Sequence, residues 1–375
     1  MMNSGLSSAA RKRLASLMPG QRIDPEFALD IARSGSVHEL GDAALRQRRA
    51  RHGDKAYFVY NQHLNYTNVC RNQCRFCAFF KRKGEDGGYT YSLDKVRELL
   101  LARIDHPIRE IHIVGGLNPD LPYQYYLDLL ALCREIRPQA VIKAFTAVEI
   151  AHFADTWGRD ERTVLAELRA AGLQVLTGGG AEVFSAAMRA KLCPEKVSGE
   201  RWLHIHGLAH EMGIKTNSTM LFGHIESWED RIEHLNALRT LEDAKPGFVC
   251  FIPLAYQTRN NELGAAGPTG EEYLRMIAVS RLFLDNIPHI KAYWAFAGIK
   301  AAQMALWAGA DDFDGTIVEE KIGHAAGADS PKGLTIAELT EVIAATGFTP
   351  VQRDTFFEEL GTAVETSHTT ADVGR

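Results

Sequence analysis

Residues 65–80 of this 375-residue chain read NYTNVCRNQCRFCAFF and place Cys70, Cys74 and Cys77 in a CxxxCxxC spacing. Three thiolates in one short loop can ligate three irons of a 4Fe–4S cluster and leave the fourth iron open to bind a substrate. A structural zinc site would need a fourth ligand, for which His63 is a nearby candidate, but no second CxxC or HxxxC pair lies close. Packing of buried cysteines is the other alternative, although the intervening Arg, Asn and Gln suit a core segment poorly. The loop therefore predicts a cluster held by these three cysteines.

Composition and cysteine usage predict a cytoplasmic protein. The formal net charge of −5 gives no general attraction to nucleic acid or anionic membrane, so we expect neither as a partner. The first twenty residues contain a basic run but no apolar stretch of signal-peptide length, and no run of 18 apolar residues occurs. Cys133, Cys193 and Cys250 are scattered, unlike the framework of a secreted disulfide protein. We expect these three to pack in the core or the pocket.

The rest of the chain predicts an α/β fold, a TIM-like (β/α) barrel. From residue 56 onward, short apolar runs alternate with amphipathic helical stretches, which is typical of βα units around a parallel sheet. The predicted strands are 57–60, 110–114, 141–145, 173–176, 214–221, 248–253, 290–293 and 313–316. We expect an N-terminal helical cap over residues 1–50, the barrel over 51–330, and a C-terminal helix with a mobile tail over 331–375.

Glycine and polar residues follow several of these runs. Gly115 and Gly116 follow the second predicted strand, Thr146 to Glu149 the third, Gly178 to Glu182 the fourth, and Gly223 to Glu226 the fifth. Because parallel barrels gather their active sites at the C-terminal ends of the strands, this pattern predicts an enzyme.

The cysteine loop resembles that of the radical S-adenosylmethionine (SAM) superfamily, whose motif has an aromatic residue before the third cysteine, here Phe76. The resemblance implies that SAM binds the open iron. One electron, from a low-potential donor of flavodoxin or ferredoxin type, would then release a 5′-deoxyadenosyl radical. Gly115 and Gly116 match the glycines whose backbone meets the methionine amino group, with a plain turn as the alternative. Glu182 and Arg201 are candidates for the ribose hydroxyls and the methionine carboxylate, although a surface ion pair would look the same.

Over residues 50–360 the chain is similar to the aminofutalosine synthase family of the futalosine route to menaquinone. The similarity lies in the segments NYTNVCRNQCRFCAFF, HIVGGLNPDLP, IKAFTAVEIAHFA, GGGAEVF, KLCPEKVSGERWLHIH, NSTMLFGHIE, FIPLAY, DNIPHIKAYW and GADDFDGTIVEEKIGHAAGA. It implies that the adenosyl radical adds to the enol-ether double bond of 3-[(1-carboxyvinyl)oxy]benzoate. Aryl migration and loss of bicarbonate would then give aminodeoxyfutalosine and methionine. Thr177 and Asn118 depart from the family's pattern, in which proline and histidine are frequent.

Two other classes of function stay open on the sequence alone: a hydrogen-abstracting radical enzyme and a noncatalytic protein. Dehypoxanthine futalosine cyclase and deazaflavin cofactor synthase share several of these stretches and use the radical to abstract hydrogen, whereas KAFTAVEI and CPEK favour the synthase. A noncatalytic iron–sulfur sensor would not need so many glycines and polar groups at the strand ends.

A substrate with two carboxylates needs cationic or hydrogen-bonding groups beside an apolar wall. We expect substrate contacts from Arg281, His289, Lys291, Asn68, Asn217 and Thr219, and proton handling by Glu149, His224 and Thr146. The alternatives are a helix-surface charge for Arg281, a barrel-end ion pair for Lys291, and for Glu149 a helix cap or an ion pair with Lys143. His206 and His210 lie four apart on a predicted helix, but the glutamate of an HExxH zinc motif is missing.

Overall fold

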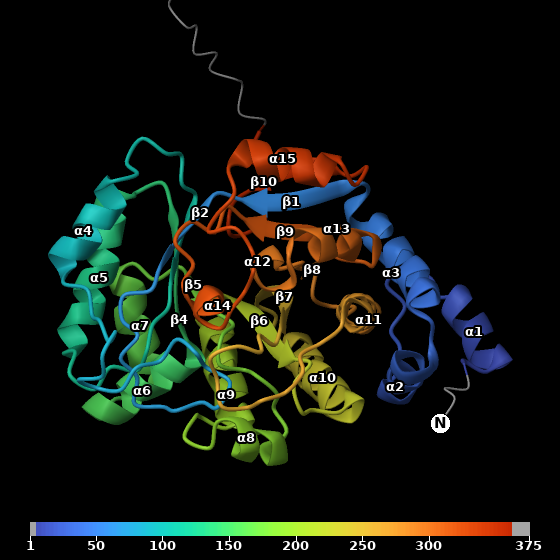
Figure 1. Cartoon of the computed structure of the whole chain (residues 1–375), viewed down its shortest axis with the longest axis horizontal. Coiled ribbons are helices and arrows are strands. Elements are labelled where there is room, and N and C mark those ends of the chain that lie inside the picture. Colours follow the sequence, from blue (N-terminus) through green and yellow to red (C-terminus); the bar gives the residue numbers. More distant parts are fainter. Residues whose placement is uncertain (1–4, 362–375) are drawn as a thin grey trace, which may run out of the picture.

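The computed structural model describes residues 5–361 and confirms the α/β fold class. A curled parallel sheet of seven strands, in sequential order from β2 to β8, forms its centre, and helices cover the outside (Figure 1). The strands are β2 (Asn61–Leu64), β3 (Glu110–Ile113), β4 (Val141–Thr146), β5 (Val175–Thr177), β6 (Lys215–Phe222), β7 (Phe248–Ala255) and β8 (His289–Ile290). All seven run parallel, so their C-terminal ends lie at one edge.

A second parallel sheet joins two distant parts of the chain. In it β1 (Lys55–Val59) lies between β10 (Thr349–Arg353) and β9 (Asp312–Gly315). After Tyr60 the chain continues directly into β2, so residues 55–64 serve both sheets. Isolated bridges pair Gln62 of β2 with Val318, three residues after β9, and Lys291, directly after β8, with Asp312 of β9.

The predicted first and eighth barrel strands, 57–60 and 313–316, therefore lie in the second sheet. The strand that leads into the cysteine loop is β2, which the sequence analysis missed. It reads Asn-Gln-His-Leu, and no apolar run marks it. Two of its polar side chains, Asn61 and His63, line an internal cavity, which explains why they are polar.

The helices outside the main sheet begin at residues that cap them. The side chains of Ser92, Asp160, Ser198 and Thr269 each accept a hydrogen bond from a backbone N–H in the first turn. The helices are α4 (Leu93–Leu101), α5 (Tyr123–Ile136), α6 (Ala147–Trp157), α7 (Glu161–Ala171), α8 (Ala186–Leu192), α9 (Gly199–Glu211), α10 (Trp228–Ala244), α11 (Gly270–Phe283), α12 (Trp294–Ala297), α13 (Ile299–Trp307), α14 (Ile322–Ala325) and α15 (Ile336–Ala344). None of the described helices is long and apolar enough to span a membrane.

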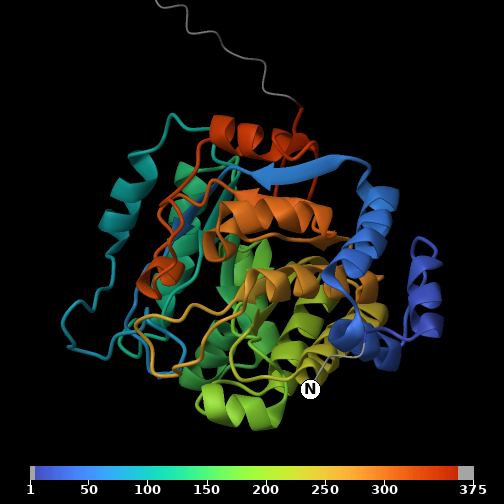
Figure 2. The same ribbon diagram turned by 45° about the vertical axis from the view of Figure 1, so that its right-hand side comes forward.

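The N-terminal segment is helical, as the sequence predicts. It forms α1 (Ser8–Ala15), α2 (Pro25–Ser34) and α3 (Val37–His52), and α2 and α3 lie against α10 and α11 on one side of the molecule (Figures 1 and 2). Asp24 caps α2, accepting a hydrogen bond of 2.8 Å from the Phe27 N–H, and Pro25 occupies the first turn. The domain boundaries at residues 50 and 330 stay predictions. Residues 362–375 of the expected mobile tail lie outside the described residues.

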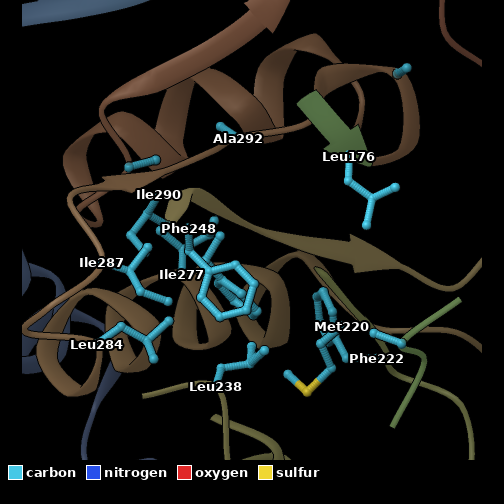
Figure 3. Packing of buried hydrophobic residues seen from close by; sticks show 14 of the residues in the cluster. Leu176, Met220, Phe222, Leu238, Phe248, Ile277, Leu284, Ile287, Ile290 and Ala292 are labelled. Carbon is cyan, nitrogen blue, oxygen red and sulfur yellow. The ribbon is translucent and has the colours of Figure 1, made fainter. Parts of the chain in front are cut away.

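Buried apolar side chains between the sheet and its helices hold the strands in place. Figure 3 shows Phe248 of β7 near Ile277 of α11 and Ile287 before β8, and all three are buried. Burying one such side chain contributes about 1.5–3 kcal/mol. The strand ends that carry the polar residues therefore extend from a closely packed scaffold.

Candidate active site

A cavity of about 310 Å³ lies inside the curled sheet and reaches its C-terminal edge. The predicted site residues that line it are Cys70, Cys74, Phe76, Cys77, Gly115, Gly116, Thr146, Glu149, Glu182, Asn217, Thr219 and Lys291. Asn68, Arg201, His224, Arg281 and His289 lie outside it. The structure thus brings together the three cysteines and most of the candidates at the strand ends.

Backbone hydrogen bonds hold the cysteine loop at the mouth of this cavity. The Arg71 N–H donates to the Leu117 carbonyl at 3.0 Å, and the Leu117 N–H points at the Cys70 sulfur at 3.3 Å. On the other side, the Arg75 N–H donates to the Leu192 carbonyl at 3.0 Å, which places Cys74 against the end of α8. The loop is therefore fixed both to the segment after β3 and to the end of α8, which follows β5.

The three sulfurs suit a multi-iron cluster better than one metal ion. Burial raises the pKa of all three thiols, that of Cys74 to about 12, so thiolates here need the positive charge of bound metal. A structural zinc ion takes four protein ligands, whereas three cysteines are the set that a 4Fe–4S cluster with one open iron needs. Among the described residues, His52, His289 and Asp311 form a separate group whose ligand atoms lie within 4.8 Å of one another.

The glycine turn after β3 packs directly against the cysteine loop. A Cβ on Gly116 would lie 2.3 Å from the Val69 carbonyl oxygen and 3.1 Å from the Cβ of Cys70, and one on Gly115 would lie 2.7 Å from the Tyr66 ring. Only glycine permits these approaches. The first role of the pair is thus to bring the loop close to β3, and contact with a methionine amino group stays a prediction.

Glu149 combines a cap with a perturbed carboxyl group. It is the third residue of α6, and its Oε2 accepts a hydrogen bond of 2.7 Å from the Thr146 N–H in a capping box. Its Oε1 accepts one of 2.8 Å from the Tyr66 hydroxyl and one of 3.3 Å from the Gly115 N–H. Burial outweighs these bonds and raises the pKa of Glu149 to about 7. The expected cap is therefore present, whereas Lys143 pairs with Glu110 instead.

Lys196 is a buried cation in the cavity that the sequence analysis missed. It lies between α8 and α9, with its Nζ 2.6 Å from Oε1 of Glu182 and 5.2 Å from the centre of the Phe76 ring. These three side chains form a charged and aromatic wall beside the cysteines. The segment CPEK follows no helical or strand periodicity, so the sequence does not predict that its lysine is buried. The contact with Glu182 becomes evident only in the folded structure.

Two family models match the chain. The Radical SAM superfamily model covers residues 64–238, which contain the cysteine loop, the glycine turn and Glu182. The chain belongs to the radical SAM superfamily. The CofH/MqnC C-terminal region model covers residues 245–365. Radical SAM enzymes use a 4Fe–4S cluster and SAM, and the three cysteines predicted to hold that cluster line the cavity.

Two radical SAM relatives match nearly the full length. The chain is 43% identical to the aminodeoxyfutalosine synthase of Thermus thermophilus, with 92% of this chain and 94% of that protein covered. It is 40% identical to the aminodeoxyfutalosine synthase of Streptomyces coelicolor, with 96% of this chain and 95% of that protein covered. The crystal structure of methylornithine synthase shares the fold, with a TM-score of 0.70 at 17% identity. The match covers 91% of this chain and 97% of that protein.

Arg201 and His224 lie outside the radical SAM pocket, contrary to expectation. Arg201, on the outer helix α9, is half exposed and bound to Asp155 at 2.7 Å and Glu161 at 2.8 Å. The side chain of His224 is shielded from solvent, with Nε2 3.1 Å from the Leu221 carbonyl and Nδ1 2.8 Å from Glu226. Arg201 thus forms the surface ion pair given as its alternative, and His224 fixes the turn after β6.

Arg281, His289 and Asn68 also have structural partners elsewhere. Arg281 and His289 both bind Asp311, at the opposite end of the sheet from the cysteine loop. Asn68 holds the segment after the loop, since its amide donates to Gly87 at 3.0 Å and accepts from Tyr89 at 2.7 Å. None of the three lines the cavity, and we withdraw them as substrate contacts.

The remaining candidates face the pocket. Thr219 donates to the Gly178 carbonyl at 2.6 Å, and Thr146 caps α6. The amide oxygen of Asn217 is buried without a hydrogen-bond partner among the described residues. Lys291 lines the pocket but is held by Asp314, which is the barrel-end ion pair considered above. Asn217 therefore has the clearest unmet capacity to bind a ligand.

Proposed function

We propose that the chain is an aminodeoxyfutalosine synthase. It would join the 5′-deoxyadenosyl group of SAM to 3-[(1-carboxyvinyl)oxy]benzoate and yield 6-amino-6-deoxyfutalosine, methionine and bicarbonate for menaquinone biosynthesis. The observation that carries the proposal is the identity of 43% and 40% to two aminodeoxyfutalosine synthases over almost the whole chain. A cavity with cysteine ligands at its mouth and polar groups inside supports it.

In this proposal Cys70, Cys74 and Cys77 hold the cluster. When bound, the cluster supplies the electron that cleaves the S–C5′ bond of SAM, and a flavodoxin- or ferredoxin-type donor reduces it. Phe76 and the Glu182–Lys196 pair border the cysteines and would orient SAM. A cytoplasmic location, where thiols stay reduced, fits these free cysteines and stays a prediction.

Apolar side chains would protect the radical. Val148, Ile252, Leu254 and Phe296 line the cavity and exclude water from its wall. They also offer a surface for the aromatic ring of the substrate, while Asn217 offers a hydrogen-bond acceptor.

Glu149 is the group that we expect to move a proton. Release of a carboxyl group as bicarbonate takes up water, and that water must lose a proton. With a pKa of about 7, the Glu149 carboxyl group can accept this proton near neutral pH. Its hydrogen bonds from Tyr66 and Gly115 fix its orientation at the cavity wall.

The test is product analysis by mass spectrometry on anaerobically reconstituted enzyme given SAM, a reductant and the enol ether. An adduct of adenosyl and substrate supports the proposal. Release of 5′-deoxyadenosine without an adduct would instead favour a hydrogen-abstracting relative, a possibility raised by the name of the C-terminal family model. Cys74→Ala should lose both cluster and product. Cys133→Ala is the matched control, because Cys133 is buried in α5 outside the cavity.

A further inference from the structure

A polar row crosses the inner wall of the cavity and has no assigned role. The parallel register pairs His63 of β2 with His112 of β3, and His112 with Lys143 of β4. The two imidazole rings stack, with centroids 4.6 Å apart and planes 17° from parallel. All three side chains line the cavity. We call His63, His112 and Lys143 the floor row.

Within the floor row, only the histidines lack a partner. The Nζ of Lys143 lies 2.5 Å from Glu110, and across the cavity Lys291 is held by Asp314. In the part of the chain that the structure describes, neither imidazole side chain takes part in a hydrogen bond or an ion pair. His63 is buried and His112 is half-buried, and their ring nitrogens are open to the cavity. Two stacked, unpartnered imidazoles facing a cavity therefore indicate a ligand group that completes them.

The position of the cysteine loop sets the direction in which a substrate lies. SAM would bind at the loop, next to the glycine turn, so the carbon that receives the adenosyl group must lie there. His112 lies on β3, three residues before Gly115 in the turn that follows the strand, which corresponds to about 10 Å of extended chain. The end of the substrate remote from the reacting carbon therefore points toward the floor row.

We propose that the stacked pair His63 and His112 binds the ring carboxylate of the aromatic substrate. This inference rests on the proposed function and adds a binding site to it. Each imidazole can donate one N–H to a carboxylate oxygen. The two strands fix the spacing of the donors, so the pair selects a carboxylate at that end of the ring.

The charged groups around the histidines are paired with one another. Burial lowers the pKa of both imidazoles, so both are neutral at neutral pH. The ionisable groups that act on them are Lys143, Lys291, Glu110, Asp314 and Glu320. Each of the three carboxylates already has a cationic or imidazole partner: Glu110 binds Lys143, Asp314 binds Lys291, and Glu320 lies 3.0 Å from His324. An incoming carboxylate thus meets acids that are already neutralised.

The experiment compares two substrates on four proteins. The substrates are 3-[(1-carboxyvinyl)oxy]benzoate and 2-phenoxyacrylate, which lacks only the ring carboxylate. The proteins are the wild type, His63→Gln, His112→Gln and the control His204→Gln, whose side chain is exposed on α9. We expect each cavity variant to raise the KM of the full substrate about tenfold or more, with little change for 2-phenoxyacrylate. The control should match the wild type on both.

Three readouts separate the outcomes. Equal losses on both substrates, or no loss on either, would overturn the carboxylate site. A wild type that makes no adduct from the full substrate would overturn the proposed function itself. Iron content and SAM cleavage show whether each variant keeps its fold and cluster, and either histidine variant alone suffices for the comparison.

Discussion

Glu149→Gln tests the perturbed carboxyl group in the cavity. Glu149 is 1% exposed, and burial raises its pKa from 4.5 to about 7. This difference corresponds to about 3 kcal/mol. Because the folded-state pKa is raised, the stabilising contribution is complete below pH 4.5 and is lost as the pH rises through about 7. Glutamine stays neutral at every pH, so the variant should lack this loss.

Urea unfolding of the anaerobic holoenzyme between pH 5 and pH 8 measures the effect. Both carboxyl oxygens of Glu149 accept hydrogen bonds, from the Tyr66 hydroxyl and the Thr146 N–H. The NH₂ group of glutamine cannot accept, so one of these donors loses its partner. This loss should lower the free energy of unfolding of the variant by about 1–3 kcal/mol at low pH. As the pH rises, the free energy of unfolding of the wild type should fall relative to that of Glu149→Gln, and the two curves should converge or cross. Adduct formation should fall about 100-fold or more, with iron content unchanged. Parallel stability curves would refute the raised pKa, and an unchanged rate would refute the proton-transfer role.

Three further substitutions test the geometry of the site. Gly116→Ala should lower the iron content of the protein, because the added Cβ would lie 2.3 Å from the Val69 carbonyl oxygen. The control Gly270→Ala should keep its iron, because a Cβ at that position meets no atom within 4 Å. Lys196→Met should cost about 3–5 kcal/mol in thermal unfolding and raise the KM for SAM, since it leaves Glu182 buried and unpaired. Arg201→Met should change stability by less than about 1 kcal/mol and leave that KM unaltered, whereas a raised KM would return Arg201 to the site.

The sequence alone located the parts of the site that local chain geometry determines. Cys70, Cys74 and Cys77 lie within eight residues, so their spacing specifies a common loop. Gly116 and Glu149 follow predicted strands directly, and the parallel sheet carries both to one edge. Such residues are predictable because each depends on one strand and its adjoining turn.

The missed and misplaced residues depend on contacts between distant elements. Lys196 reaches Glu182 only because the segment between α8 and α9 folds over the cysteine loop. In the sequence, His63 is only a possible zinc ligand and His112 is not singled out, because a polar residue inside a short strand looks like a break in the apolar pattern. Arg281 and His289 lie at the N-terminal end of the sheet, away from the cysteine loop: His289 opens β8, and both residues bind Asp311.

The chain from residue 55 to residue 64 has a consequence for biosynthesis. Its second half pairs with β3, about 50 residues downstream, whereas Lys55 pairs with Thr349, which leaves the ribosome nearly 300 residues later. The nascent protein can therefore pair β2, which leads into the cysteine loop, with β3 early. It can pair β1 with β10 only when synthesis is almost complete. Cluster insertion should accordingly follow release of the full polypeptide, and chains truncated before β10 should accumulate without iron.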